Sequence, residues 1–171
     1  MEVSEKQTGL FDFFTQCLQD LYGAEKKVVK SYAALSLASF TPELQSALTT
    51  QSEEGHSHIS RLELIFNMLD YQPGKCRCEI IELLSEKAAS IVKNVETGTA
   101  LRDAEIIYAV QLIAHYKIAS YGSLVSLMGE IGYPDAEILL DQCLTEEKNA
   151  DAYLTQIAVN FINPAAKKES E

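Results

Sequence analysis

Basic residues are scarce in this sequence. Its 171 residues include 14 Lys and Arg against 25 Asp and Glu, which gives a formal net charge of −11. Nucleic-acid binding requires patches of lysine and arginine that neutralise phosphates, and polybasic attachment to a membrane surface requires similar clusters. We therefore expect neither a nucleic acid nor a membrane as a partner.

Long apolar runs and targeting signals are absent as well. No stretch reaches the roughly 18–20 uninterrupted apolar residues of a membrane span, and the opening residues MEVSEK do not combine a basic segment with an apolar one. A cytoplasmic location is the expectation. The four cysteines are then expected to be reduced. The Cys76-Arg77-Cys78 pair would need further thiols or imidazoles nearby to hold a metal.

Apolar residues recur at steps of three and four over most of the chain, which predicts four long amphipathic helices. The first covers about 9–39 with Thr8 as its N-cap, and the second begins at Pro42. The third ends at Gly132 and the fourth follows Pro134. At 47% hydrophobic residues, the chain has enough apolar surface to build one core without disulfides.

The spacing of these helices predicts an all-α, ferritin-like four-helix bundle over 9–162, with flexible ends at 1–8 and 163–171. Tight connections near Phe40 and Tyr133 make two antiparallel hairpins, and a crossover at about 71–99 carries a short extra helix between them. When the sequence is aligned with itself at an offset of 92 residues, the two predicted hairpins show weak similarity. Glu25 then aligns with Lys117 and Pro42 with Pro134.

Polar residues interrupt the apolar stripes near the middle of each long helix. Glu25 lies on the first stripe, Glu54 and His58 on the second, Lys117 on the third and Glu146 on the fourth. Antiparallel packing would bring these positions to one layer. Several carboxylates in one buried layer need a cation, a proton or a water network to offset their repulsion and lost hydration.

Di-iron and di-manganese bundles meet this need with metal, using one Glu from each of two helices and a Glu-x-x-His pair from each of the other two. The match here is partial. The second helix also contains a literal Glu53-x-x-His56, whereas the fourth helix has no histidine. Because a stripe can rotate by one residue, the pattern leaves open whether Glu146 or Glu147 faces the core.

Four segments carry a resemblance that covers about residues 10–160. Leu21–Lys26 looks like the "LY-x-A-E-K" segment of the YciE/YciF-type stress-protein family within the ferritin-like superfamily, and Glu53–Glu63 is similar to that family's second helix. His115–Gly122 resembles its "HYEIA-x-YG" signature, and Glu146–Lys148 resembles its "EEK" segment. The resemblance implies a bundle that is usually dimeric, has a rubrerythrin-like metal site and is associated with bacterial stress.

The same comparison shows where the sequence departs from the family pattern. Glu25, Glu54 and Glu146 occupy acidic positions of the pattern. The family's "E-H-Y-E" in the third helix reads Ala114–Lys117 here, so both carboxylates are missing, and Gln51 stands where a histidine is often found. The third helix therefore offers no acidic metal ligand.

Two hypotheses follow for the polar layer. In the first, the site is degenerate: Lys117 replaces the metal as a buried counter-ion to Glu25, Glu54 and Glu146, with His58 protonated or a proton shared. In the second, Glu25, Glu54, His58 and Glu146 bind iron or manganese in an oxidase, a peroxidase or an iron-handling protein. A third class is a plain partner-binding bundle that forms a homodimer. No catalytic residue and no small-molecule substrate can be named.

Overall fold

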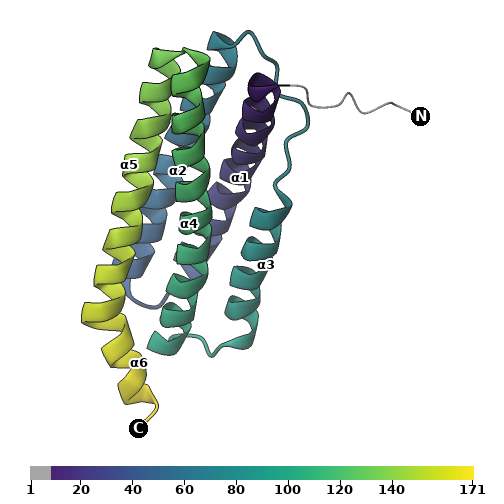
Figure 1. Ribbon diagram of the computed structural model, residues 1–171. Helices are drawn as coiled ribbons and strands as arrows, with labels where there is room; N and C mark the ends of the chain where they lie inside the picture. Colours follow the sequence, from purple (N-terminus) through teal and green to yellow (C-terminus); the bar gives the residue numbers. More distant parts are fainter. Residues whose placement is uncertain (1–8) are drawn as a thin grey trace.

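The computed structural model describes residues 9–171, and the chain forms an all-helical bundle over this range (Figure 1). The predicted N-cap Thr8 and the predicted flexible segment 1–8 lie outside the described residues. Gly9, in extended conformation, directly precedes the first helix. The helices are α1 (Leu10–Ala38), α2 (Pro42–Met68), α3 (Glu79–Asn94), α4 (Ala100–Ile131), α5 (Pro134–Ile157), the π-helical turn η1 (Ala158–Ile162) and α6 (Asn163–Glu169).

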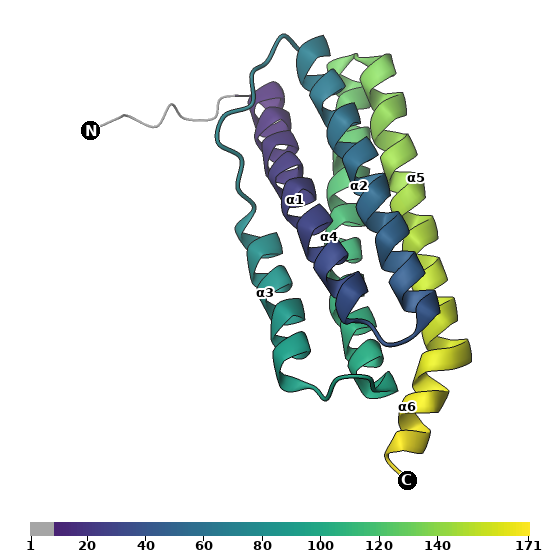
Figure 2. The ribbon, with the colours of Figure 1, turned by 180° about the vertical axis from the view of Figure 1, so that it is seen from behind.

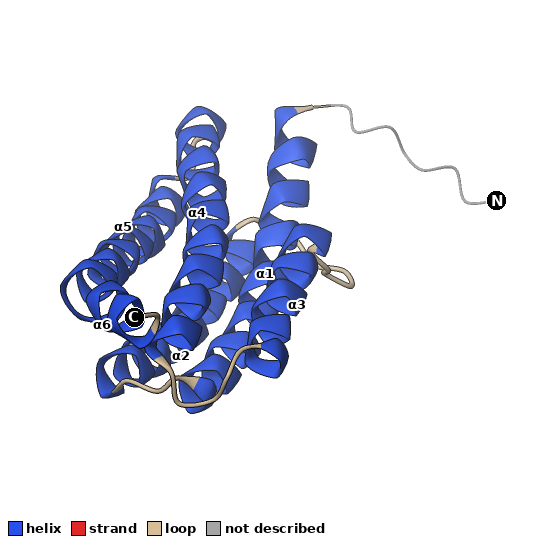
Figure 3. Ribbon diagram, turned by 90° about the horizontal axis from the view of Figure 1, so that it is seen from below, coloured by secondary structure: helices blue, strands red, loops and turns tan. Residues whose placement is uncertain are grey.

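The long helices form the predicted pair of hairpins. α1 packs against α2 and α4 packs against α5, each pair antiparallel, as Figures 1 and 2 show from opposite sides. The crossover returns along the height of the bundle, and its helix α3 lies on the outside, against α1 and α4 (Figure 3). The ferritin-like topology expected from the connection lengths is thereby confirmed.

Local signals explain where the helices begin and end. Pro42 and Pro134 stand at the first positions of α2 and α5, where a missing N–H costs no helical hydrogen bond. Gly132 ends α4 with φ of 89°, a left-handed conformation that glycine adopts without steric penalty. The Thr99 side chain accepts a hydrogen bond from the backbone N–H of Arg102 and caps α4.

The glutamate that α5 buries is Glu147, whereas Glu146 is half-buried. A repeat of alternating three and four residues drifts around a helix of 3.6 residues per turn. A small rotation of the stripe therefore exchanges these two neighbours, which the pattern had left open.

The C-terminal segment also differs from its prediction. Residues 163–169, expected to be a flexible tail, form α6, which contacts the beginning of α4. The Glu169 carboxylate accepts hydrogen bonds from the backbone N–H groups of Ala100 (2.8 Å) and Leu101 (3.0 Å). An acidic side chain at these free N–H groups complements the positive end of the helix dipole, which gives this polar tail a reason to be ordered.

A second acidic cap joins the two hairpins. Asp103, fully buried in the first turn of α4, accepts hydrogen bonds from the backbone N–H groups of Phe40 and Thr41, both at 2.8 Å. These two residues lie in the α1–α2 turn.

Among the helices of residues 9–171, none combines the length and the hydropathy that a membrane-spanning helix requires.

Candidate functional site: a buried charged cluster

Four charged or titratable side chains meet in the middle of the bundle, one from each long helix. They are Glu25 of α1, His58 of α2, Lys117 of α4 and Glu147 of α5, with exposed fractions of 0%, 1%, 1% and 7%. We call these four residues the core cluster. Such a group is stable in a low-dielectric interior only when its charges are matched and its hydrogen bonds are made.

Lys117 is the centre of the core cluster. Its Nζ lies 2.5 Å from Glu147 Oε1 and 3.0 Å from Glu25 Oε2. The first contact is an aligned hydrogen bond and the second is an ion pair. Burial alone would lower the pKa of Lys117, but the two carboxylates outweigh burial and raise it. The two carboxylates therefore favour the charged form of this buried lysine.

Glu25 is held ionised by its neighbours. Tyr121 donates a hydrogen bond of 2.6 Å to Glu25 Oε1, and His58 Nδ1 lies 3.1 Å from the same oxygen. Burial by itself would raise the pKa of Glu25, but Lys117, His58 and the tyrosine hydroxyl together lower it to about 2. For Glu147, burial outweighs the attraction of Lys117, and its pKa is raised.

The surroundings of His58 define its protonation state. Nδ1 faces Glu25 Oε1 at 3.1 Å, and Nε2 faces Glu146 Oε2 at 2.8 Å. A neutral imidazole has one donor, so it would turn a lone pair toward one of these carboxylates, whereas an imidazolium donates to both. Burial lowers the pKa of His58, but the hydrogen bond and charge of Glu25 outweigh it and the pKa is raised. The geometry therefore favours the imidazolium.

Arg61 completes the charge balance at the edge of the core cluster. Its Nη1 and Nη2 donate to the two oxygens of Glu146 at 2.6 and 3.0 Å, a bidentate arrangement. This hydrogen bonding lowers the pKa of Glu146. Together with the core cluster, the pair sets three carboxylates against three cations when His58 is protonated.

The structure separates the sequence-predicted site residues into three groups. Glu25, His58 and Lys117 lie together in the core cluster. Glu146 reaches it only through His58, because Glu147 is the residue that faces Lys117. Glu53 and His56, the literal Glu-x-x-His pair, are exposed.

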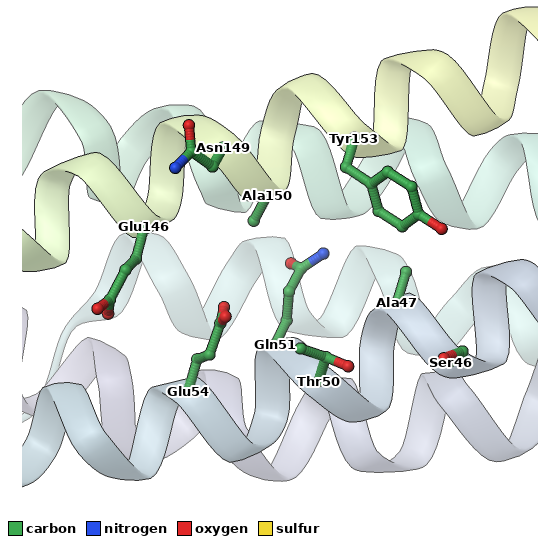
Figure 4. A pocket seen from close by; sticks show the side chains of 9 residues that line it. All are labelled: Ser46, Ala47, Thr50, Gln51, Glu54, Glu146, Asn149, Ala150 and Tyr153. Atoms are coloured by element: carbon green, nitrogen blue, oxygen red, sulfur yellow. The ribbon is translucent and has the colours of Figure 1, made fainter.

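Glu54 lies beside the core cluster rather than in it. It is half-buried and lines a pocket of about 360 Å³ between α2 and α5, into which Glu146 also points (Figure 4). Burial, and then repulsion from Glu146, raises the pKa of Glu54. The two carboxylates thus form the outer, solvent-facing side of the polar layer.

The sequence pattern did not identify Arg61 as a site residue and gave no particular partner for the Tyr121 hydroxyl. Arg61 lies one helical turn after His58 on α2, and its long, partly buried side chain reaches Glu146. That spacing is the only signal in the sequence. Tyr121 follows Lys117 by four residues on the same face of α4, a spacing that places its hydroxyl beside the same carboxylate.

The donors of the core cluster do not fit a two-metal carboxylate centre. Glu25, His58 and Glu147 offer one ligand atom each within 4.8 Å of one another. However, Lys117 Nζ contacts both carboxylates, and both ring nitrogens of His58 are engaged by carboxylates. Two-metal bundles use four carboxylates and two histidines, and a resident ammonium would repel an added cation.

The crossover cysteines have separate partners. The Cys76 thiol donates to the Gly74 carbonyl and the Cys78 thiol to the Tyr116 hydroxyl, at 3.3 and 3.1 Å. Burial raises the pKa of Cys76, which disfavours its reactive thiolate form. Among the described residues, one group of side chains has the spacing of metal ligands. It consists of Glu25, His58 and Glu147 of the core cluster and includes neither crossover cysteine.

Two hairpins, a long crossover and a polar layer at mid-height define a ferritin-like helical bundle. The family described as Domain of unknown function (DUF892) matches residues 9–167, and the chain belongs to this family, as the resemblance to YciE/YciF-type proteins predicted. Protein YciF of Escherichia coli K12 is 34% identical over 160 residues, which cover 93% of this chain and 96% of that protein.

Solved structures agree with this assignment. The crystal structure of the E. coli stress protein YciF matches with a TM-score of 0.87 over 91% of this chain and 98% of that one, at 34% identity. YcfI of Rhodopseudomonas palustris matches with a TM-score of 0.85 over 90% and 98% of the two chains, at 28% identity. A protein of Xanthomonas campestris at 18% identity shares the fold, with a TM-score of 0.74 over 95% of this chain and 100% of that one.

Proposed function

We propose that this chain is a stress-associated ferritin-like protein whose metal site is degenerate, with Lys117 in the place of the metal. The association with stress comes from its similarity to the E. coli stress protein YciF. One observation carries the degenerate site: Lys117 Nζ contacts both buried carboxylates, Glu25 and Glu147. No catalytic activity is assigned to the core cluster.

The charge balance supports this proposal. In a two-metal bundle, the excess of carboxylates creates the affinity for cations. Here Lys117 and the His58 imidazolium offset Glu25 and Glu147, and Arg61 offsets Glu146. A metal ion would have to displace covalently attached cations that cannot leave.

Metal analysis of protein purified without chelators tests the proposal. The parent protein is expected to retain far less than one ion per chain after loading with Fe(II) or Mn(II) and desalting. Lys117→Glu removes the resident cation and adds a ligand, so we expect this variant to bind one of these metals. Lys148→Glu, an exposed change on α5, makes the same charge change and is expected to bind none.

A functional iron or manganese protein, acting as an oxidase, a peroxidase or an iron-handling protein, is the alternative. The spacing of Glu25, His58 and Glu147 favours it, since three ligand atoms within 4.8 Å of one another can surround one ion. Stoichiometric metal in the parent protein, lost on Glu25→Gln substitution, would support the alternative and contradict the degenerate site.

We also propose that the protein is a homodimer. The beginning of α1 and the end of α2 lie at the same end of the bundle (Figure 1). Both segments carry exposed apolar side chains. Sedimentation is expected to give a dimer for the parent and a monomer for Phe13→Glu, while Leu37→Glu at the other end of α1 leaves the dimer intact. The exposed apolar residues at the end of the bundle where α1 begins and α2 ends are Leu10, Phe11, Phe13, Leu64 and Met68.

A further inference from the structure

A second pocket lies away from the core cluster, between α1 and the crossover helix α3. It is an open groove of about 430 Å³ with a mainly apolar lining that includes Leu35, Ala89 and Val92. Pockets of about 300–1,000 Å³ hold drug-sized ligands. None of its lining residues is aromatic, which argues against a ligand that binds by stacking, such as a nucleobase.

Lysines are concentrated at this groove. Lys27 and Lys30 of α1 and Lys93 of α3 line it, against a single carboxylate, Glu86. None of the three lysines forms an ion pair within the described range, although Glu82 interacts with Lys27 through its charge. In a chain of net charge −11, such an unpaired positive site selects an anion.

A buried hydroxyl in the groove has no partner. Ser85 of α3 also lines the groove and is 5% exposed, and its Oγ makes no hydrogen bond to any described residue. Buried hydroxyls are normally hydrogen-bonded, and an unpaired one favours a ligand that supplies an acceptor. This observation is independent of the lysines and also points to an oxygen-bearing ligand.

The polar and apolar lining residues follow the same order on both helices. α1 and α3 run in the same direction (Figure 1), and Lys27, Lys30 and Ser85 precede the apolar lining residues of their own helices. The apolar residues Leu35, Ala89 and Val92 follow toward the carboxyl ends of both helices.

We propose that this groove binds a free aliphatic carboxylate of medium chain length. Lys27, Lys30 and the Ser85 hydroxyl hold the carboxylate, and the chain lies along the apolar residues that follow. The observed combination of unpaired ammonium groups, an unpaired buried hydroxyl and a non-aromatic apolar floor is complementary to such an amphipathic anion.

Calorimetric titration of the full chain with sodium decanoate, below its micellar concentration, tests this proposal. We expect saturable binding at one site per chain and no comparable binding of decyltrimethylammonium, which has the same chain and the opposite charge. Absence of decanoate binding, or equal binding of the cation, would overturn the proposal. The proposal would also be overturned if the protein sedimented with anionic phospholipid vesicles but did not bind decanoate. The ligand would then be a membrane surface.

Two variants assign the binding to these residues. The double variant Lys27→Gln, Lys30→Gln is expected to weaken decanoate binding at least about fivefold. Lys26→Gln is the matched control, because Lys26 stacks over the Tyr22 ring and does not line the groove. An equal loss with the control would show that general charge, and not the groove, binds the anion.

Ser85→Ala separates ligand binding from folding. Since the Ser85 hydroxyl has no partner in the described part of the protein, its removal is expected to leave the melting temperature unchanged or higher while weakening decanoate binding severalfold. A lower melting temperature with unchanged affinity would mean that the hydroxyl serves the fold, and would contradict its role in binding.

Discussion

Replacing Lys117 with methionine removes a buried positive charge and keeps most of the side-chain volume. Lys117 is 1% exposed and contacts Glu147 at 2.5 Å and Glu25 at 3.0 Å. In its absence, the two carboxylates share only the His58 imidazolium. One negative charge is then left without a partner in the core of the bundle.

The expected loss is large for a single substitution. Breaking a buried ion pair by removing one partner costs about 3–5 kcal/mol. At this chain length, 1 kcal/mol shifts the melting temperature by roughly 2–4 °C, so we expect a decrease of about 6–20 °C near neutral pH. The loss should shrink at lower pH, by at most about 1.4 kcal/mol per pH unit, as Glu147 takes up a proton.

Urea unfolding followed by circular dichroism measures this effect across a pH series. Lys148→Met, at an exposed position on α5, is the control for loss of a lysine. The substitutions at Lys117 and Glu147 should also be coupled. Glu147→Gln should destabilise the parent but stabilise the Lys117→Met variant. The interaction energy in the double-mutant cycle should be about 1–3 kcal/mol. A Lys117→Met variant within about 0.5 kcal/mol of the parent, or additive effects of the two substitutions, would refute the buried ion network.

Three further predictions concern His58, two glycines and the Glu169 cap. Since carboxylates raise the pKa of His58 above 6.5, the imidazolium stabilises the fold fully below that pH and this stabilisation is lost as the pH rises through the folded-state value. The urea midpoint should therefore decrease as the pH rises through the folded-state pKa of His58. We expect this decrease in the parent and in His56→Gln, but not in His58→Gln. Gly23→Ala should cost about 1–3 kcal/mol in thermal unfolding, because its Cβ would lie 2.9 Å from the crossover backbone, whereas Gly122→Ala, with open space, should gain about 0.5–1 kcal/mol. Glu169→Ala should remove about 0.3–1 kcal/mol of capping and accelerate amide hydrogen exchange in the first turn of α4, and unchanged exchange would argue against the cap.

Helix ends and topology were predictable because they depend on local chemistry. Pro42, Pro134 and Gly132 mark boundaries wherever they occur in a helical pattern. Two short connections and one long one then restrict the bundle to very few arrangements.

The site was predictable only in part. Glu25, His58 and Lys117 interrupt otherwise apolar stripes, which is why the pattern identified them. Glu146 and Glu147 are neighbours about 100° apart on one helix, so a small rotation of the stripe exchanges them. Arg61 was missed because its partner is set by the reach of a long side chain, which periodicity does not describe.

The Asp103 cap has a consequence for how the chain folds. The α1–α2 turn takes its hydrogen-bond acceptor from a residue more than 60 positions later in the sequence, beyond the whole second helix and the crossover. An α1–α2 fragment would lack this acceptor, so its turn should fray more than the same turn in the full chain. The turn of the first hairpin is therefore completed only when α4 packs against it.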